Sequence, residues 1–166
     1  SFAREIQPIL DRHCAGCHND ARLWEERLGR VVKITQSPPS PASSANQSAF
    51  SLLDTPVIEN LPKRQWSASY LALVQATEKS LEGNQYLAGT TDGVVNWISA
   101  QSSPEMLLPY AAGADRSRLL SLLAEGHYDV KLAKEDIERI ACWIDLLVPF
   151  CGDYEEANVW DANDKE

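Results

Sequence analysis

The stretch RHCAGCHND, residues 12–20, holds four side chains that could bind a metal or form a covalent bond, namely His13, Cys14, Cys17 and His18. Its centre, CAGCH, is a C-x-x-C-H pentapeptide. At this spacing two thiols can form thioethers with the two vinyl groups of one porphyrin. The histidine after the second cysteine then lies next to the iron as an axial ligand. The pentapeptide therefore predicts one covalent haem c, held by Cys14 and Cys17, with His18 as its proximal ligand.

Other uses of paired cysteines fit the chain less well. A structural zinc site requires a second ligand pair at short spacing, whereas Cys142 and Cys151 are nine positions apart. A thioredoxin-like dithiol is expected after a strand in a βαβ unit, whereas the residues before Cys14 have the periodicity of a helix. Ordinary disulfides are a third alternative.

The elements that must position this motif have the periodicity of helices. Apolar residues recur at helical spacing in 2–13, 65–79, 115–126 and 134–150. Pro8 lacks a backbone donor, so it must lie in a first turn or bend the helix. The last helix has an apolar stripe made of Ile137, Ile140, Ala141 and Ile144, with Leu147 or Val148 continuing it, before Pro149. No series of alternating strands is present, so the expected fold class is all-α with long irregular loops.

A single domain over residues 1–166 is expected, since this length is ordinary for one domain. Residues 36–49 are rich in Ser and Pro and predict a surface loop. Residues 152–166 carry many acids and predict a solvated C-terminal tail.

Two stretches resemble a known family. EIQPILDRHCAGCHN, residues 5–19, resembles the opening of planctomycete-type cytochrome c domains, which carry I-x-P-I-L shortly before C-x-x-C-H. Residues 93–160 are similar to the C-terminal cytochrome region of the hydrazine synthase alpha subunit and its relatives. Together these stretches cover roughly half to two thirds of the chain. The resemblance implies a cytochrome c-like helical fold around one haem, often as a module of a larger extracytoplasmic protein.

The sixth ligand of the iron would decide between electron transfer and chemistry at an open site. In cytochrome c folds, the loop before the last helix usually supplies this ligand, and here that loop contains His127. Gly126 frees the turn, so His127 is the preferred distal ligand. Met106, the chain's one methionine, is the alternative. His13 lies too close to the motif to reach the opposite face readily, and an iron without a distal protein ligand stays a further alternative.

The other two cysteines bear on location. Thioethers to haem are formed outside the cytoplasm, where disulfides persist. We therefore expect an extracytoplasmic chain, periplasmic or secreted, with a disulfide between Cys142 and Cys151. The alternative is two separate buried thiols.

Composition narrows the function. The formal net charge of −9 argues against nucleic acid, whose recognition needs a basic face. No apolar run approaches the roughly 20 residues of a membrane-spanning helix. No acid–base pair, activated nucleophile or phosphate loop accompanies the motif. The sequence thus favours a monohaem electron carrier over an enzyme, with redox proteins or other domains of a parent chain as partners. The alternative is a haem enzyme or sensor with an open distal site for peroxide, a nitrogen oxide or carbon monoxide.

Overall fold

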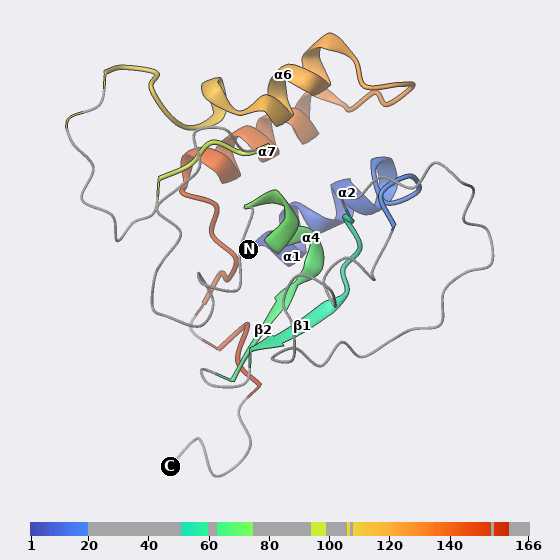
Figure 1. Cartoon of the computed structure of the whole chain (residues 1–166), viewed down its shortest axis with the longest axis vertical. Coiled ribbons are helices and arrows are strands. Elements are labelled where there is room, and N and C mark those ends of the chain that lie inside the picture. The colour runs from blue at the N-terminus through green and yellow to red at the C-terminus, as the bar shows by residue number, and fades with distance from the viewer. Residues whose placement is uncertain are drawn as a thin grey trace.

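The computed structural model of the chain describes residues 1–19, 51–59, 63–74, 94–98, 106, 108–153 and 155–159. The predicted loop at 36–49 lies outside these residues. In chain order the elements are α1 (Phe2–Glu5), α2 (Gln7–His13), β1 (Pro56–Glu59), β2 (Arg64–Ser67), α4 (Ala68–Leu73), the 3-10 helix η2 (Ala114–Arg116), α6 (Arg118–Glu125) and α7 (Lys134–Asp145) (Figure 1).

The prediction of an all-α, cytochrome c-like fold is wrong. Strands β1 and β2 form an antiparallel hairpin in which Val57 lies opposite Trp66, so the described chain mixes helices with a sheet. The apolar periodicity of residues 65–79 concealed this change. Its first part is β2, and α4 begins only after Ser67, whose hydroxyl caps the helix by accepting from the backbone N–H of Tyr70 at 3.2 Å.

The N-terminal helix is divided at Ile6, as its proline required. Pro8 lies in the first turn of α2, where its missing N–H would have had no partner within the helix. The helix ends at His13 with Cys14 as its C-cap, and the backbone N–H of Cys14 donates to Leu10 O. The CAGCH motif therefore begins at the end of a helix whose Ile9 and Leu10 are buried in the core.

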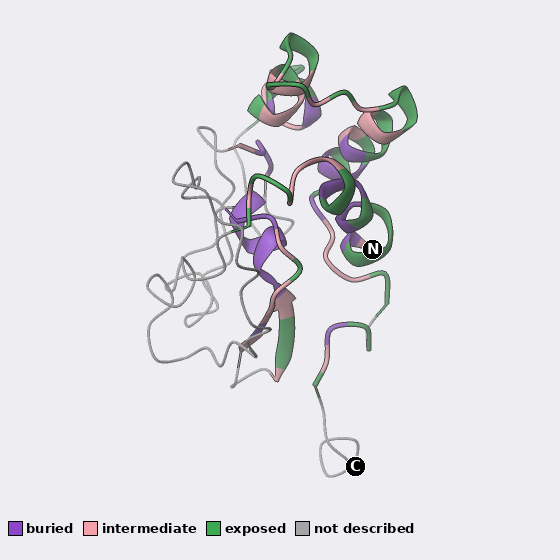
Figure 2. Cartoon of the chain, turned by 90° about the vertical axis from the view of Figure 1, so that its right-hand side faces the viewer, coloured by how far each residue is buried: buried purple, intermediate pink, exposed green. Residues whose placement is uncertain are grey.

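The core lies where α1, α2, α4 and α7 meet, and Figure 2 shows most of its buried residues there. Phe2 is fully buried and packs edge-on against Tyr70, with ring centroids 5.2 Å apart. It also packs against the tilted ring of Trp143, with centroids 5.4 Å apart. The Tyr70 hydroxyl donates to Val148 O at 2.9 Å. This aromatic cluster joins the first and last helices of the described chain.

The predicted stripe of the last helix is confirmed at Ile140 and Ile144, whereas Ile137 and Ala141 are only half-buried and Val148 lies beyond the end of the helix. Ile140, Ile144 and Val148 are buried, and α7 ends at Asp145, ahead of Pro149. Trp143 lies off this stripe and its indole N–H donates to Pro149 O at 3.1 Å. Burying such apolar side chains contributes about 1.5–3 kcal/mol each, so α7 is held mainly by its middle and its C-terminal half.

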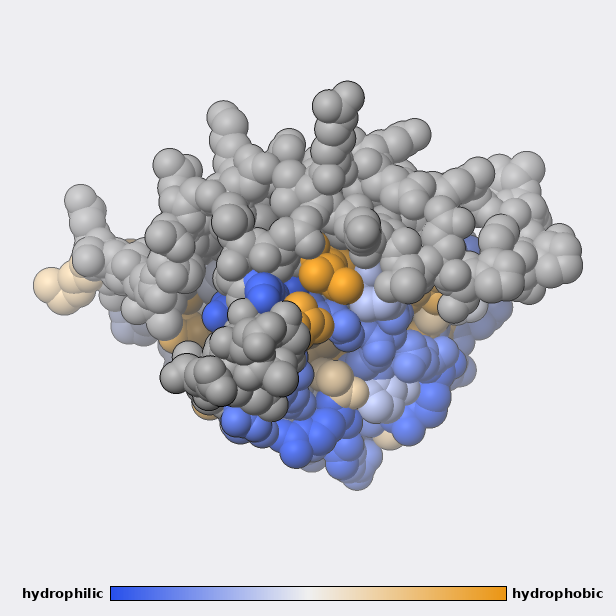
Figure 3. Space-filling model, turned by 90° about the horizontal axis from the view of Figure 1, so that it is seen from below, coloured by the Kyte–Doolittle hydropathy of each residue, from blue (hydrophilic) through white to orange (hydrophobic). Residues whose placement is uncertain are grey.

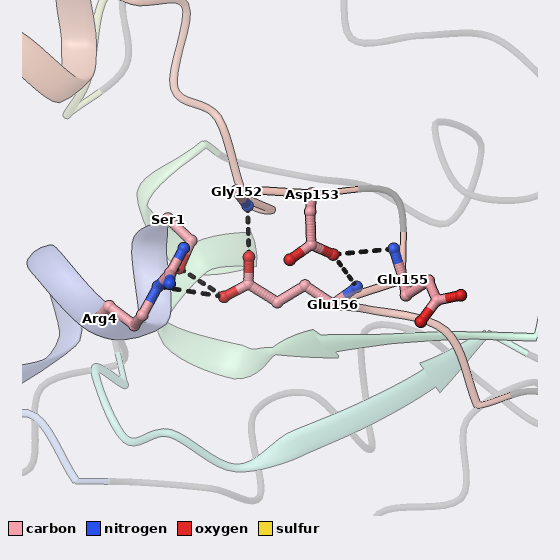
Figure 4. Close-up of polar contacts among 6 residues, drawn as sticks. All are labelled: Ser1, Arg4, Gly152, Asp153, Glu155 and Glu156. Atoms are coloured by element: carbon pink, nitrogen blue, oxygen red, sulfur yellow. Dashed lines mark hydrogen bonds and ion pairs between the residues drawn. The ribbon is translucent and has the colours of Figure 1, made fainter.

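The segment predicted as a solvated tail is partly ordered against the hairpin. The N–H of Gln65 donates to Ala157 O at 2.7 Å, and the N–H of Val159 donates to Lys63 O at 2.9 Å. Glu156 accepts hydrogen bonds from the Ser1 hydroxyl at 2.6 Å and from the N–H of Gly152 (Figure 4). The C-terminal segment thus connects the hairpin, through backbone bonds, to the start of α1, through Glu156.

The end of the molecule that carries the hairpin is mostly hydrophilic over its described part, with a few apolar side chains beside the grey residues (Figure 3). Among the described segments, no helix combines the length and the apolar character that crossing a bilayer requires.

Candidate functional site

The CAGCH motif forms one compact turn after α2. The Cys14 carbonyl accepts from the N–H groups of both Cys17 and His18, at 3.1 and 3.0 Å. The amide of Asn19 donates to Gly16 O at 3.2 Å. On the far side, the N–H of Leu52 donates to His18 O at 2.8 Å. The motif is therefore held at both ends, by α2 and by the segment that leads into β1.

The two motif cysteines are free thiols, with Cys14 half-buried and Cys17 exposed. Burial raises the pKa of Cys14, and the neighbouring Cys17 raises it further. A redox dithiol needs a lowered cysteine pKa, typically at a helix N-terminus. Here the pair follows the C-terminus of α2, whose dipole disfavours a thiolate. The surroundings of Cys14 therefore do not favour the dithiol alternative.

The structure brings His18 and His127 together. Their ring centroids are 6.0 Å apart and their planes are within 14° of parallel. Two imidazoles that share one metal ion have centroids about 6 Å apart, because each metal–nitrogen bond is about 2.0 Å and each nitrogen lies about 1.1 Å from its ring centroid. Both side chains are half-buried. The centroid spacing therefore matches that of two imidazoles on one metal ion, and the near-parallel planes are those of a stacked pair.

A tight turn presents His127 at this place. Gly126 ends α6 with φ at +100°, a backbone conformation that L side chains rarely adopt. The N–H of Val130 then donates to His127 O at 3.1 Å and closes the turn. Within the turn Tyr128 has φ at +50°, and its exposed ring contacts His127 edge-on, with centroids 4.9 Å apart. The role predicted for Gly126 in freeing this turn is confirmed.

An ion pair joins the end of α2 to the start of α7. Nη2 of Arg12, in the last turn of α2, donates to both carboxylate oxygens of Asp136 at 3.3 and 3.2 Å. Nε2 of His13 lies 3.9 Å from the same carboxylate. Asp136 lies in the first turn of α7. The start of α7, the helix that follows the loop of His127, is thus bound to the residues directly before CAGCH.

These residues fit a covalent haem in their chemistry. The two thiols are unpaired with each other, and two imidazoles lie at a spacing that suits a shared metal ion. Leu119, Leu123 and Leu132, on either side of His127 in sequence, are half-buried against the core and offer the apolar surface that a porphyrin requires. Two surface hollows of the described chain lie elsewhere, one beside Trp66 and Phe150 and one beside Trp97 and Ile144.

The remaining candidates are placed apart from this pair. Met106 is 99% exposed, so its side chain packs against nothing in the described chain. His13 faces Asp136. Over the described residues, no group of three or more His, Cys, Asp or Glu side chains is arranged to hold a metal ion, which gives the zinc alternative no support.

The predicted Cys142–Cys151 disulfide is not formed in the structure, where both residues are free thiols. Cys142 is exposed on α7. Cys151 is half-buried, and burial raises its pKa, an effect that Arg64 opposes. Its charged neighbours are Arg64 of the hairpin and Asp153 and Glu156 of the C-terminal segment.

Sequence reasoning did not find Arg12 and Asp136. Asp136 has no role predicted from the sequence, and Arg12 appears there only as part of the stretch around CAGCH. Their pairing joins positions far apart in the chain, and nothing local in one sequence marks it. The acid at a helix start and the base directly before the motif were the only signals available.

No family model matches the chain, and no curated protein or solved structure shows significant similarity to it. The resemblance to planctomycete-type cytochrome c domains therefore stays a prediction.

Proposed function

We propose that this chain binds one haem c covalently through Cys14 and Cys17 and transfers single electrons, with His18 and His127 as the axial ligands. The observation that carries the proposal is the pairing of His18 with His127 at 6.0 Å, directly after the C-x-x-C-H motif. The proposal depends on this motif and this pair, and is independent of the predicted all-α fold, which is wrong.

When bound, the haem would supply a one-electron couple, so that a single electron could pass from a reduced redox protein to an oxidised one with no bond made or broken. The chain's residues would do the rest. Cys14 and Cys17 would fix the porphyrin to the end of α2, while His18 and His127 would occupy both axial positions. Without an open position on the iron, a carrier is favoured over an enzyme or a gas sensor.

The same proposal implies where the chain is located in the cell and which proteins it exchanges electrons with. Thioether attachment to haem takes place outside the cytoplasm, so the chain is assigned an extracytoplasmic place. Its partners are single-electron redox proteins or other domains of a longer parent chain. A formal net charge of −9 favours partners with a basic docking face.

The visible absorption spectrum of the haem-loaded chain tests the ligand assignment. We expect the unmodified chain to be low-spin, because two imidazoles provide a strong ligand field, and His127→Ala to become high-spin. Met106→Leu is the matched control, since Met106 lies in solvent, and it should keep the low-spin spectrum.

Two results would count against the assignment. A high-spin spectrum of Met106→Leu would make methionine the distal ligand. A high-spin unmodified chain would mean an open iron, and the haem enzyme or sensor alternative would replace the carrier.

A further inference from the structure

Asp136 connects the start of α7 to the end of α2. Its carboxylate accepts two hydrogen bonds from Arg12 Nη2, at 3.2 and 3.3 Å, and lies 3.9 Å from His13 Nε2. Its side chain is only 15% exposed, whereas that of Arg12 is 57% exposed. An acid in a first helical turn normally projects into water. This one is covered by contacts with another helix.

The start of α7 has no side-chain cap, and its first turn has no fully buried residue. Ala133 occupies the N-cap position, and no side chain there accepts a hydrogen bond from the first turn. The unpaired N–H groups of such a turn are usually satisfied by a Ser, Thr, Asp or Asn cap. The fully buried residues of α7 are Ile140, Trp143 and Ile144, all beyond its first turn. The contact with Arg12 therefore fixes the start of the helix and not its body.

Both proposed axial ligands are attached close to this contact. Arg12 and His13 directly precede CAGCH, and His18 follows within the same turn. On the other side, Asp136 is nine positions after His127, and part of that interval is the closed turn from His127 to Val130. Fixing Asp136 against α2 thus limits where the His127 ring can lie relative to His18.

We propose that Asp136 is a positioning residue that, through Arg12, holds the His127 imidazole in place against His18. This inference rests on the proposed function, because it concerns the ligation of the same haem. Loss of the contact should leave the body of α7 packed and loosen only the loop that carries His127.

Asp136→Asn tests this role, because the amide keeps the size of the side chain and removes its charge. Glu135→Gln is the matched control, since it removes one acid from the same turn and its side chain is exposed. The readout is the limiting rate at which carbon monoxide binds the reduced haem, which requires His127 to leave the iron. We expect a rise of up to about fivefold for Asp136→Asn, the range of one partly exposed ion pair, and no change for Glu135→Gln. Equal rates in the two variants would overturn the proposal.

A second variant separates positioning from simple support of the helix start. Ala133→Asp supplies the missing cap but no bond to α2. In the Asp136→Asn background, we expect this change to raise the unfolding midpoint while the carbon monoxide rate stays high. If the added cap returns the rate to that of the unmodified chain, Asp136 only supports the helix and the positioning role is wrong.

His127→Ala in the same assay separates the positioning role of Asp136 from the proposed ligation of the haem by His127. If His127→Ala binds carbon monoxide at once and Asp136→Asn behaves like the control, only the positioning role fails. If His127→Ala and the unmodified chain have the same kinetics, the ligand assignment fails and the positioning role fails with it.

Discussion

At the scale of residues, CAGCH is held as one turn, in which the Cys14 carbonyl accepts from the N–H groups of Cys17 and His18. The spacing of Cys14, Cys17 and His18 is the one that a covalent haem requires, so a short window of sequence was enough to propose such a site. The pairing of His18 with His127, by contrast, cannot be derived from a short window of sequence. His127 could be ranked first from its loop and from Gly126, but its distance from His18 depends on how α2, α6 and α7 pack.

Replacing the motif cysteines tests the attachment itself. We expect the double variant Cys14→Ser, Cys17→Ser to lose all covalent haem, because serine forms no thioether, while the unmodified chain keeps one haem per chain under denaturing conditions. Denaturing mass spectrometry measures this directly. Each single variant should retain one thioether.

The other two cysteines provide the control. Cys142→Ser, Cys151→Ser should carry the same covalent haem as the unmodified chain, because these thiols lie on α7 and beside the hairpin. Covalent haem on the Cys14→Ser, Cys17→Ser variant would show that attachment occurs elsewhere. The unmodified mass also reports whether Cys142 and Cys151 are joined.

At the scale of elements, the last helix was predictable and the hairpin was not. The stripe of Ile140 and Ile144 extends over several turns, and such a long apolar repeat leaves no alternative to a helix. The strands β1 and β2 have four residues each, too few for an alternating pattern to be recognised. Trp66 lies in β2 because pairing with Val57 and packing on the core outweigh a local helical periodicity.

The C-terminal segment was also misjudged, because acidity alone does not reveal a hydrogen bond. The side-chain hydrogen bond from Ser1 is the main cause that lowers the pKa of Glu156, followed by the backbone bond from Gly152. Arg4 lies 3.7 Å away and acts in the same direction. A carboxylate bound in this way joins α1 to the segment that pairs with β2.

This lowered pKa predicts a pH-dependent stability. A carboxyl group whose pKa is lower in the folded state stabilises the fold above its unfolded pKa of about 4.3, and this contribution is lost as pH falls through the folded pKa. Glu156→Gln should therefore lower the free energy of unfolding near neutral pH by up to about 1 kcal/mol. The difference from the unmodified chain should shrink in acid.

Urea unfolding across that pH range measures the effect. Glu155→Gln is the control, because its side chain is exposed. This variant should have the same free energy of unfolding as the unmodified chain across the pH range. A difference between Glu156→Gln and the unmodified chain that is constant with pH would mean that the Glu156 carboxylate contributes through packing and not through its charge.

At the scale of the whole molecule, the charge and the position of the proposed site bear on the proposed carrier function. The chain is acidic, with 24 acids against 15 bases, and the proposed site is formed by the CAGCH turn and the turn of His127, which lie far apart in the chain. The core that joins α1, α2, α4 and α7 holds these segments together. The composition indicated the acidic charge. Only the packing of the first helices against the last shows why His18 and the distant loop of His127 meet.

The most direct test of the central claim is the kinetics of carbon monoxide binding to the reduced, haem-loaded, unmodified chain. If His18 and His127 both bind the iron, binding should be slow and should reach a limiting rate that no longer rises with carbon monoxide concentration, because His127 must leave first. Fast binding with a rate proportional to concentration, or a chain that takes up no haem at all, would contradict the account.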